Sequence, residues 1–214
     1  MSLIKKLAGE TALYGLSNIL NRVLNYLIVT PYLTYVFNDD QGEYGIHGIM
    51  YAFAALLMVI LTYGMETAFF RFVNQKDQDT STVLSTATLS LSATTLLFVA
   101  AIIAFAEPVA AFLTRPEDSR YVLLFACIVG LDVLAAVPFA HLRHQNRPIR
   151  FAAIKAVNVV ANGVFIIFFL EVFPRLAAKG ATDFNIFINP DNRLLFVFIA
   201  NLLASLLTFV MLAP

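Results

Sequence analysis

Long apolar runs separated by short polar segments dominate the pattern of this sequence. The runs reach the length of about 20 residues that an α-helix needs to cross a bilayer. They cover residues 11–37, 45–73, 81–106, 121–139, 151–173 and 194–213. They lack the short alternation of barrel strands, and backbone groups in hydrocarbon must form hydrogen bonds within their own segment. The pattern therefore predicts an all-α membrane protein, a six-transmembrane-helix bundle.

The segments between the apolar runs are polar and too short to form a second domain. The longest lies at 174–193, and 107–120 carries mixed charge with Pro108 and Pro116. The segment 38–44 is acidic, whereas 141–150 is basic. We therefore expect residues 1–214 to form a single transmembrane domain.

The composition excludes an ordinary soluble domain. Hydrophobic residues make up 60% of the chain and charged residues 13%, against about 45–50% and about 25% in soluble proteins. Fourteen basic and fourteen acidic residues leave no net charge, so nucleic acid is not an expected partner. Membrane lipids are the partners that this composition predicts.

The distribution of basic residues predicts the orientation, because cytoplasmic connections are enriched in Lys and Arg. The first connection, 38–44, contains neither residue type. The N-terminus and two later connections carry Lys5, Lys6, Arg71, Lys76, Arg143, Arg147 and Arg150. We expect a multi-pass protein with its N-terminus in the cytoplasm.

One face of the first predicted helix is polar. Asn18, Asn21, Arg22 and Asn25 follow helical spacing, and Arg22 lies about 16 Å beyond residue 11, near the middle of the hydrocarbon core. An arginine at this depth costs roughly 2.5–3.5 kcal/mol on insertion scales. Arg22 is expected either to face a water-filled substrate cavity or to form a permanent ion pair, for which Asp132 lies at a matching depth.

Two later helices carry further candidates. Asp132 is interpreted either as a structural ion-pair partner or as a site that couples transport to a proton or sodium ion. Lys155, Asn158 and Asn162 form one stripe of the fifth helix. Lys155 either extends toward the membrane surface or lines a cavity with the two asparagines.

No residue pattern indicates covalent chemistry. His141 and His144 lack a third ligand nearby, so a metal site is not expected. Cys127 lies in an apolar run without an adjacent base, and no glycine-rich phosphate loop occurs. We expect no enzyme activity and no cofactor.

Three segments resemble a known family. GETALYGLSNILNRVLNYLIVTPYLTYVF, YGMETAFFRF and PFAHLRHQNRPIRFAAIKAVNVV are similar to bacterial polysaccharide biosynthesis proteins. These are the O-antigen type flippases of the multidrug/oligosaccharidyl-lipid/polysaccharide exporter superfamily, which act in the inner membrane in lipopolysaccharide synthesis. The resemblance implies a two-lobe protein of twelve to fourteen helices around a cationic cavity. This chain would be the N-terminal lobe, the C-terminal lobe being absent, and Arg22 matches the cavity arginines of the family's first helix.

The expected function is translocation of a polyprenyl-diphosphate-linked oligosaccharide across the bacterial cytoplasmic membrane. Cationic side chains would offset the diphosphate, and asparagines would bind sugar hydroxyls. The partners would be the lipid-linked oligosaccharide, membrane lipids and the C-terminal lobe. The alternatives are a cation-coupled multidrug antiporter of the same superfamily, or a membrane assembly subunit that transports nothing.

Overall fold

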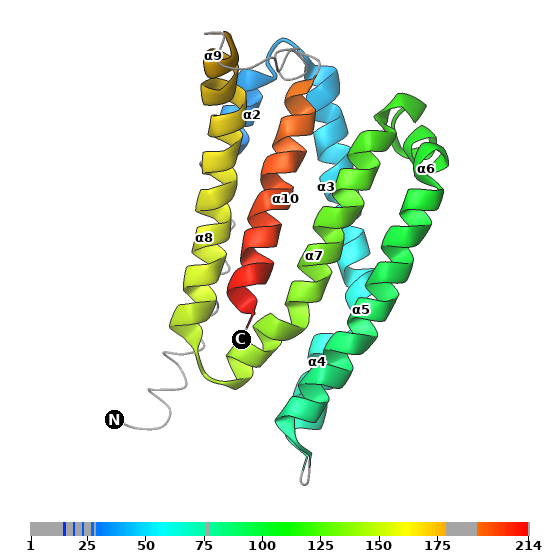
Figure 1. Cartoon of the computed structure of the whole chain (residues 1–214), viewed down its shortest axis with the longest axis vertical. Coiled ribbons are helices and arrows are strands. Elements are labelled where there is room, and N and C mark those ends of the chain that lie inside the picture. Colours follow the sequence, from blue (N-terminus) through cyan, green and yellow to red (C-terminus); the bar gives the residue numbers. More distant parts are fainter. Residues whose placement is uncertain are drawn as a thin grey trace.

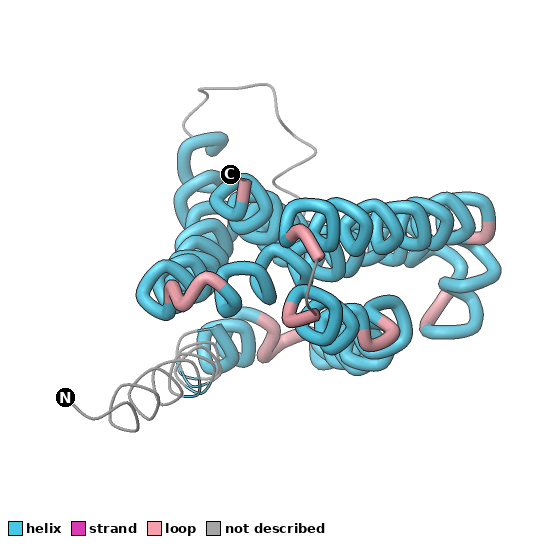
Figure 2. The backbone as a smooth tube through the Cα atoms, turned by 90° about the horizontal axis from the view of Figure 1, so that it is seen from below, coloured by secondary structure: helices cyan, strands magenta, loops and turns pink. Residues whose placement is uncertain are grey.

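The computed structural model describes residues 15, 19, 23, 27, 29–75, 78–178 and 192–213, and their regular secondary structure is entirely helical (Figure 1). Long helices run side by side, and Figure 2 shows the bundle from below, with some helices end-on and others running across the view. The elements are α2 (Thr30–Val36), α3 (Gln41–Thr62), α4 (Met65–Val73), α5 (Thr80–Ala104), α6 (Ala106–Leu113), the 3-10 helix η2 (Pro116–Asp118), α7 (Ser119–His144), α8 (Pro148–Ile167), the π-helix η3 (Phe168–Val172), α9 (Phe173–Ala178) and α10 (Arg193–Leu212).

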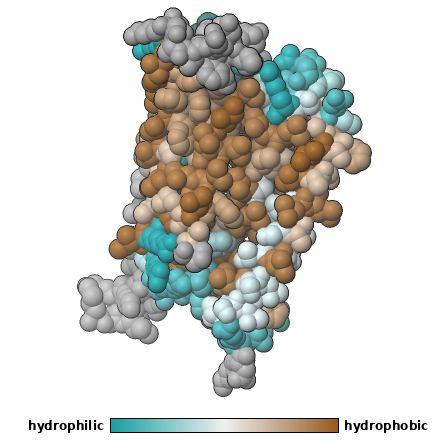
Figure 3. Space-filling model, in the orientation of Figure 1, coloured by the Kyte–Doolittle hydropathy of each residue, from teal (hydrophilic) through white to brown (hydrophobic). Residues whose placement is uncertain are grey.

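Five helical segments are long and apolar enough to cross a membrane. They are Gln41–Val73, Thr80–Ala104, Pro116–His144, Pro148–Leu176 and Arg193–Leu212. Figure 3 shows a broad hydrophobic face along the bundle, with hydrophilic residues gathered toward its ends. The predicted all-α membrane protein is confirmed. About half of the remaining predicted span, 11–37, lies outside the described residues, which include its last part as α2.

Helix α7 lies at the centre of the bundle and packs on α3, α4, α5, α6, α8 and α10. Small residues allow these helices to approach closely. A Cβ atom added at Gly130 would lie 3.3 Å from Val99 Cγ2 and 3.4 Å from Thr95 Cγ2, both on α5. Glycine at this position therefore sets the spacing between α5 and α7.

The second predicted span, 45–73, is interrupted. Tyr63 and Gly64 adopt positive φ angles of 31° and 74°, which end α3 and start α4 in a new direction. Gly64 accepts this conformation without a Cβ penalty, as glycine does after many helix ends. With 22 residues, α3 alone is about 33 Å long and can cross the hydrocarbon core. Helix α4 is therefore a separate element at one end of the bundle.

Two predicted connections are mostly helical. The basic segment 141–150 contains the end of α7 and the start of α8, so Arg143 belongs to a helix rather than a loop. The segment 107–120 contains most of α6, with Pro108 in its first turn. Backbone N–H groups in the first turn have no partner within the helix, so proline costs no hydrogen bond there. Proline and charge marked these segments as loops in the sequence, but both are compatible with helix ends.

Side chains cap several helix ends. Asp79 accepts hydrogen bonds from Ser81 and, at 3.1 Å, from the backbone N–H of Thr82, and these bonds hold the pKa of the Asp79 carboxyl below its usual value. Arg150 donates to the carbonyl oxygens of Met211 and Ala213, at 3.3 and 3.5 Å. A cation at these last carbonyls of α10 also complements the helix dipole.

Aromatic rings fill the bundle toward the end where α10 begins. Ring centroids lie 4.5 Å apart for His47 and Tyr51, 5.5 Å for Tyr51 and Phe125, and 5.8 Å for Phe125 and Phe198. Tyr51 also accepts a hydrogen bond from Asn201. We call Tyr44, His47, Tyr51, Tyr121, Phe125 and Phe198 the aromatic cluster. It ties α3, α7 and α10 together.

Candidate functional site

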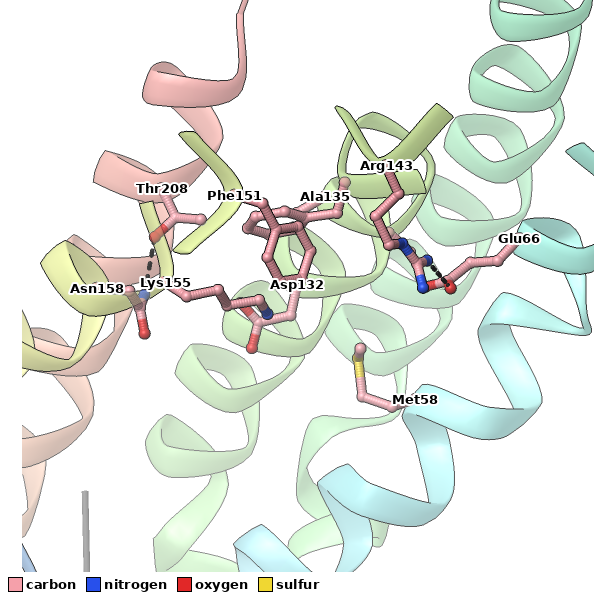
Figure 4. A pocket seen from close by; sticks show the side chains of 11 residues that line it. Met58, Glu66, Asp132, Ala135, Arg143, Phe151, Lys155, Asn158 and Thr208 are labelled. Carbon is pink, nitrogen blue, oxygen red and sulfur yellow. Dashed lines mark hydrogen bonds and ion pairs between the residues drawn. The ribbon is translucent and has the colours of Figure 1, made fainter. Parts of the chain in front are cut away.

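A cavity of about 350 Å³ lies toward the other end of the bundle, where α10 ends (Figure 4). It is bounded by α3, α4, α7, α8 and α10. We call it the polar pocket, because charged and polar side chains contribute much of its lining. These are Glu66, Asp132, Arg143, Lys155, Asn158 and Thr208.

Helical spacing places these side chains on common faces. On α7, Asp132, Ala136, Phe139 and Arg143 are four, three and four residues apart, so they line one side of the helix. On α8, Phe151, Lys155 and Asn158 repeat the pattern. Two helices thus present mixed apolar and charged faces to the same cavity.

Asp132 and Lys155 meet inside the bundle. Their side chains point toward one another across the pocket (Figure 4), and Ser205 of α10 lies beside Asp132. Lys155 Nζ lies 4.3 Å from the ring centroid of Phe139, a cation–π arrangement. Lys155 therefore lines the cavity instead of extending from the end of the bundle, and Asp132 has a cationic neighbour among the described residues.

A second pair of charges lies nearer the end of the bundle. Arg143 forms an ion pair with Glu66, which connects α7 to α4. The Arg143 guanidinium carbon also lies 5.4 Å from the ring centroid of Phe70. The sequence pattern does not indicate this pair, because its members are 77 residues apart and the pattern predicts Arg143 in a connection between helices.

Asn158 has a structural role as well as a place in the pocket. Its Nδ2 donates to Thr208 Oγ1 at 2.8 Å and to the Ala204 carbonyl at 3.1 Å. Both amide hydrogens therefore hold α8 against α10, which leaves the carbonyl oxygen as the group that can contact a ligand. Asn162 is buried one turn further along α8, and its Oδ1 has no hydrogen-bond partner among the described residues.

The other predicted site residues lie outside the described residues. These are Asn18, Asn21, Arg22 and Asn25. The proposed pairing of Arg22 with Asp132 thus stays a prediction.

The charges in the described lining balance. Glu66 and Asp132 supply two carboxylates, and Arg143 and Lys155 supply two cations. Within the described part of the chain, no group of three or more His, Cys, Asp or Glu side chains is arranged to hold a metal ion. The pocket therefore presents both carboxylates and cations to a polar molecule that enters it.

Comparison with known proteins identifies the family of the chain. Searches of curated proteins and of solved structures returned no match. Residues 7–185 match the family described as polysaccharide biosynthesis protein, which covers most of the 214 residues. The chain belongs to the polysaccharide biosynthesis protein family.

Proposed function

We propose that the protein moves a polyprenyl-diphosphate-linked oligosaccharide across the membrane. The observation that carries the proposal is the polar pocket, which places Lys155, Arg143 and Asn158 inside an apolar helix bundle. Charged groups within membrane spans are costly and typically line a substrate or ion path. Family membership supports polysaccharide biosynthesis as the process.

The headgroup and the lipid tail place opposite demands on the protein. The diphosphate and sugars need cations and hydrogen-bonding groups, whereas the polyprenyl chain is soluble in the bilayer. The polar pocket offers cations and hydrogen-bonding groups to the headgroup. Exposed apolar side chains such as Leu89, Leu97 and Val160 face the bilayer, in which the polyprenyl chain would stay. Arg22 and the asparagines of the first helix are proposed to extend the polar surface. No bond is made or broken in this process.

The proposed orientation places the N-terminus and the turn between α7 and α8 in the cytoplasm of a bacterial cell. Single cysteines, introduced after Cys127→Ser, can be labelled in intact cells with an impermeant maleimide. A cysteine at Asn38 is expected to react and one at Asn146 is not. Labelling at Asn146 from outside would reverse the orientation.

Transport is tested best in cells that carry the complete gene. Deleting the gene should leave lipid-linked oligosaccharide on the cytoplasmic side and reduce surface polysaccharide, and the intact gene should restore it. Lys155→Gln should restore surface polysaccharide poorly even after normalisation to the amount of protein in the membrane, whereas Lys6→Gln, which changes a lysine near the N-terminus, should restore it fully. Normal surface polysaccharide in the deletion strain would refute the proposal.

A further inference from the structure

The ion pair between Glu66 and Arg143 lies at the lining of the polar pocket rather than in the packed core. The side chains of Arg143 and Glu66 are 32% and 42% exposed. An ion pair with this exposure contributes little to stability, about 0–1 kcal/mol in water. Exchange of one partner for another anion is therefore inexpensive.

Arg143 also has hydrogen-bonding capacity that Glu66 does not use. Its NH2 group donates to Glu66, while its Nε is buried without a hydrogen-bond partner among the described residues. A guanidinium presents five N–H donors in a planar fork, which matches two oxygens of a phosphate. The side chain is thus only partly satisfied by its present partner.

The second cation of the pocket, Lys155, also has a carboxylate as a neighbour, although the two groups are not within ion-pair distance. Lys155 faces Asp132, and both pairs line one cavity (Figure 4). Its volume of about 350 Å³ falls in the usual range for ligand pockets, about 300–1,000 Å³. Two cations, each beside a carboxylate, suit a ligand that carries two adjacent negative groups.

We propose that Arg143 binds a phosphate of a diphosphate headgroup, and that Glu66 is the resting counter-ion which this phosphate displaces. The inference rests on the proposed function and names a residue of the same site. Glu66 therefore competes with the ligand, whereas Arg143 and Lys155 bind it. Removing Glu66 and removing Arg143 consequently have opposite effects on affinity.

The test measures binding of geranyl diphosphate to the full-length protein purified in detergent, by calorimetry. Arg143→Gln should weaken binding about tenfold or more, because a charge-assisted hydrogen bond is lost. Glu66→Gln should tighten binding several-fold, because the competing carboxylate is neutralised. Arg147→Gln is the matched control, since Arg147 is an exposed arginine of the neighbouring turn that does not line the pocket.

Two further ligands identify the group that is recognised. Geraniol, which lacks the diphosphate, should not bind, whereas inorganic pyrophosphate should compete with geranyl diphosphate. Binding of geraniol with unchanged affinity would show recognition of the chain and overturn the proposal. Arg143→Lys keeps the charge without the planar fork of the guanidinium, so its affinity for geranyl diphosphate should lie between those of the unmodified protein and Arg143→Gln. This variant also serves as a second test if Arg143→Gln does not fold.

A purely structural ion pair gives a different result. Glu66→Gln and Arg143→Gln would then lower the melting temperature together and change affinity in the same direction, which contradicts the proposal. Absence of geranyl diphosphate binding to the unmodified protein also contradicts it. Either result leaves the cell-based transport test unaffected, so the two proposals fail separately.

Discussion

The aromatic cluster and the polar pocket are built on the same helices, α3, α7 and α10, yet they are packed in opposite ways. Around Phe198, rings from α3 and α7 lie within 6.5 Å of its centroid and fill the space between the helices. Around Asp132, the helices enclose a cavity lined with charge. The comparison shows that one end of the bundle is occupied by protein side chains, and the other leaves room for a ligand. We expect the stability of the fold to depend mainly on the aromatic cluster, and ligand binding to depend mainly on the polar pocket.

Removing the ring of Phe198, at the centre of the aromatic cluster, should have the largest effect on stability. Phe198 is fully buried, so Phe198→Ala should cost roughly 3–5 kcal/mol of stability through the cavity it leaves. The affinity for geranyl diphosphate, measured below the melting temperature, should change little. Phe209→Ala on the same helix is the control, since Phe209 is 38% exposed. Equal thermal shifts for the two variants would remove the distinction between the two ends.

Removing the cation beside Asp132 should have the next largest effect on stability. Lys155→Met leaves the Asp132 carboxylate without its cationic neighbour and should lower stability by about 3 kcal/mol. Lys155→Met combined with Asp132→Asn should recover much of this loss while the ligand affinity stays low. Thermal unfolding of the single and double variants gives the coupling energy. Additive losses in the double variant would show that the two side chains act independently.

A change at the break between α3 and α4 should have a smaller effect. Gly64→Ala forces a side chain into a positive-φ conformation and should cost about 1 kcal/mol. Gly48→Ala is the matched control, because Gly48 lies within α3 with nothing within 4 Å of an added Cβ. It should be neutral or stabilising by roughly 0.5–1 kcal/mol. Equal effects in thermal unfolding would argue against strain at Gly64.

The smallest effect is expected at the polar contact within the aromatic cluster. Tyr51→Phe removes the hydrogen bond that Asn201 donates and keeps the ring. Polar contacts between membrane helices average about 0.6 kcal/mol, so the melting temperature should fall only slightly. Tyr63→Phe, which removes an exposed hydrogen bond of 3.0 Å between the Tyr63 and Ser90 hydroxyls, is the comparison. A loss of several kcal/mol at Tyr51 would mean that hydrogen bonding, rather than ring packing, holds this end together.

The helices were predictable because membrane solvation requires long apolar segments, whatever their partners. Their ends were less predictable. Hydropathy continues through Tyr63 and Gly64, so the run 45–73 looked like one helix, although glycine marks the break in the sequence. Pro108 similarly suggested a loop where it occupies the first turn of α6.

The pocket was predictable only in part. Helical periodicity put Lys155 and Asn158 on one face, and the cost of a buried charge singled out Asp132. The pairing of Glu66 with Arg143 depends on the packing of α4 against α7, which the sequence spacing along one helix does not contain. The hydrogen bond from Asn158 to Thr208 joins residues 50 positions apart. Spacing along one helix therefore does not reveal this contact either.

The break at Tyr63 and Gly64 places Glu66 close to the point where α4 begins. Helix α4 has nine residues, about 13 Å along its axis, while Glu66 lies about 3 Å from the break. A rotation of about 10° would move the far end at Val73 by about 2 Å but Glu66 by less than 1 Å. Any rotation of α4 about this break, including one that accompanied a change of partner at Arg143, would therefore displace Val73 several times as far as Glu66.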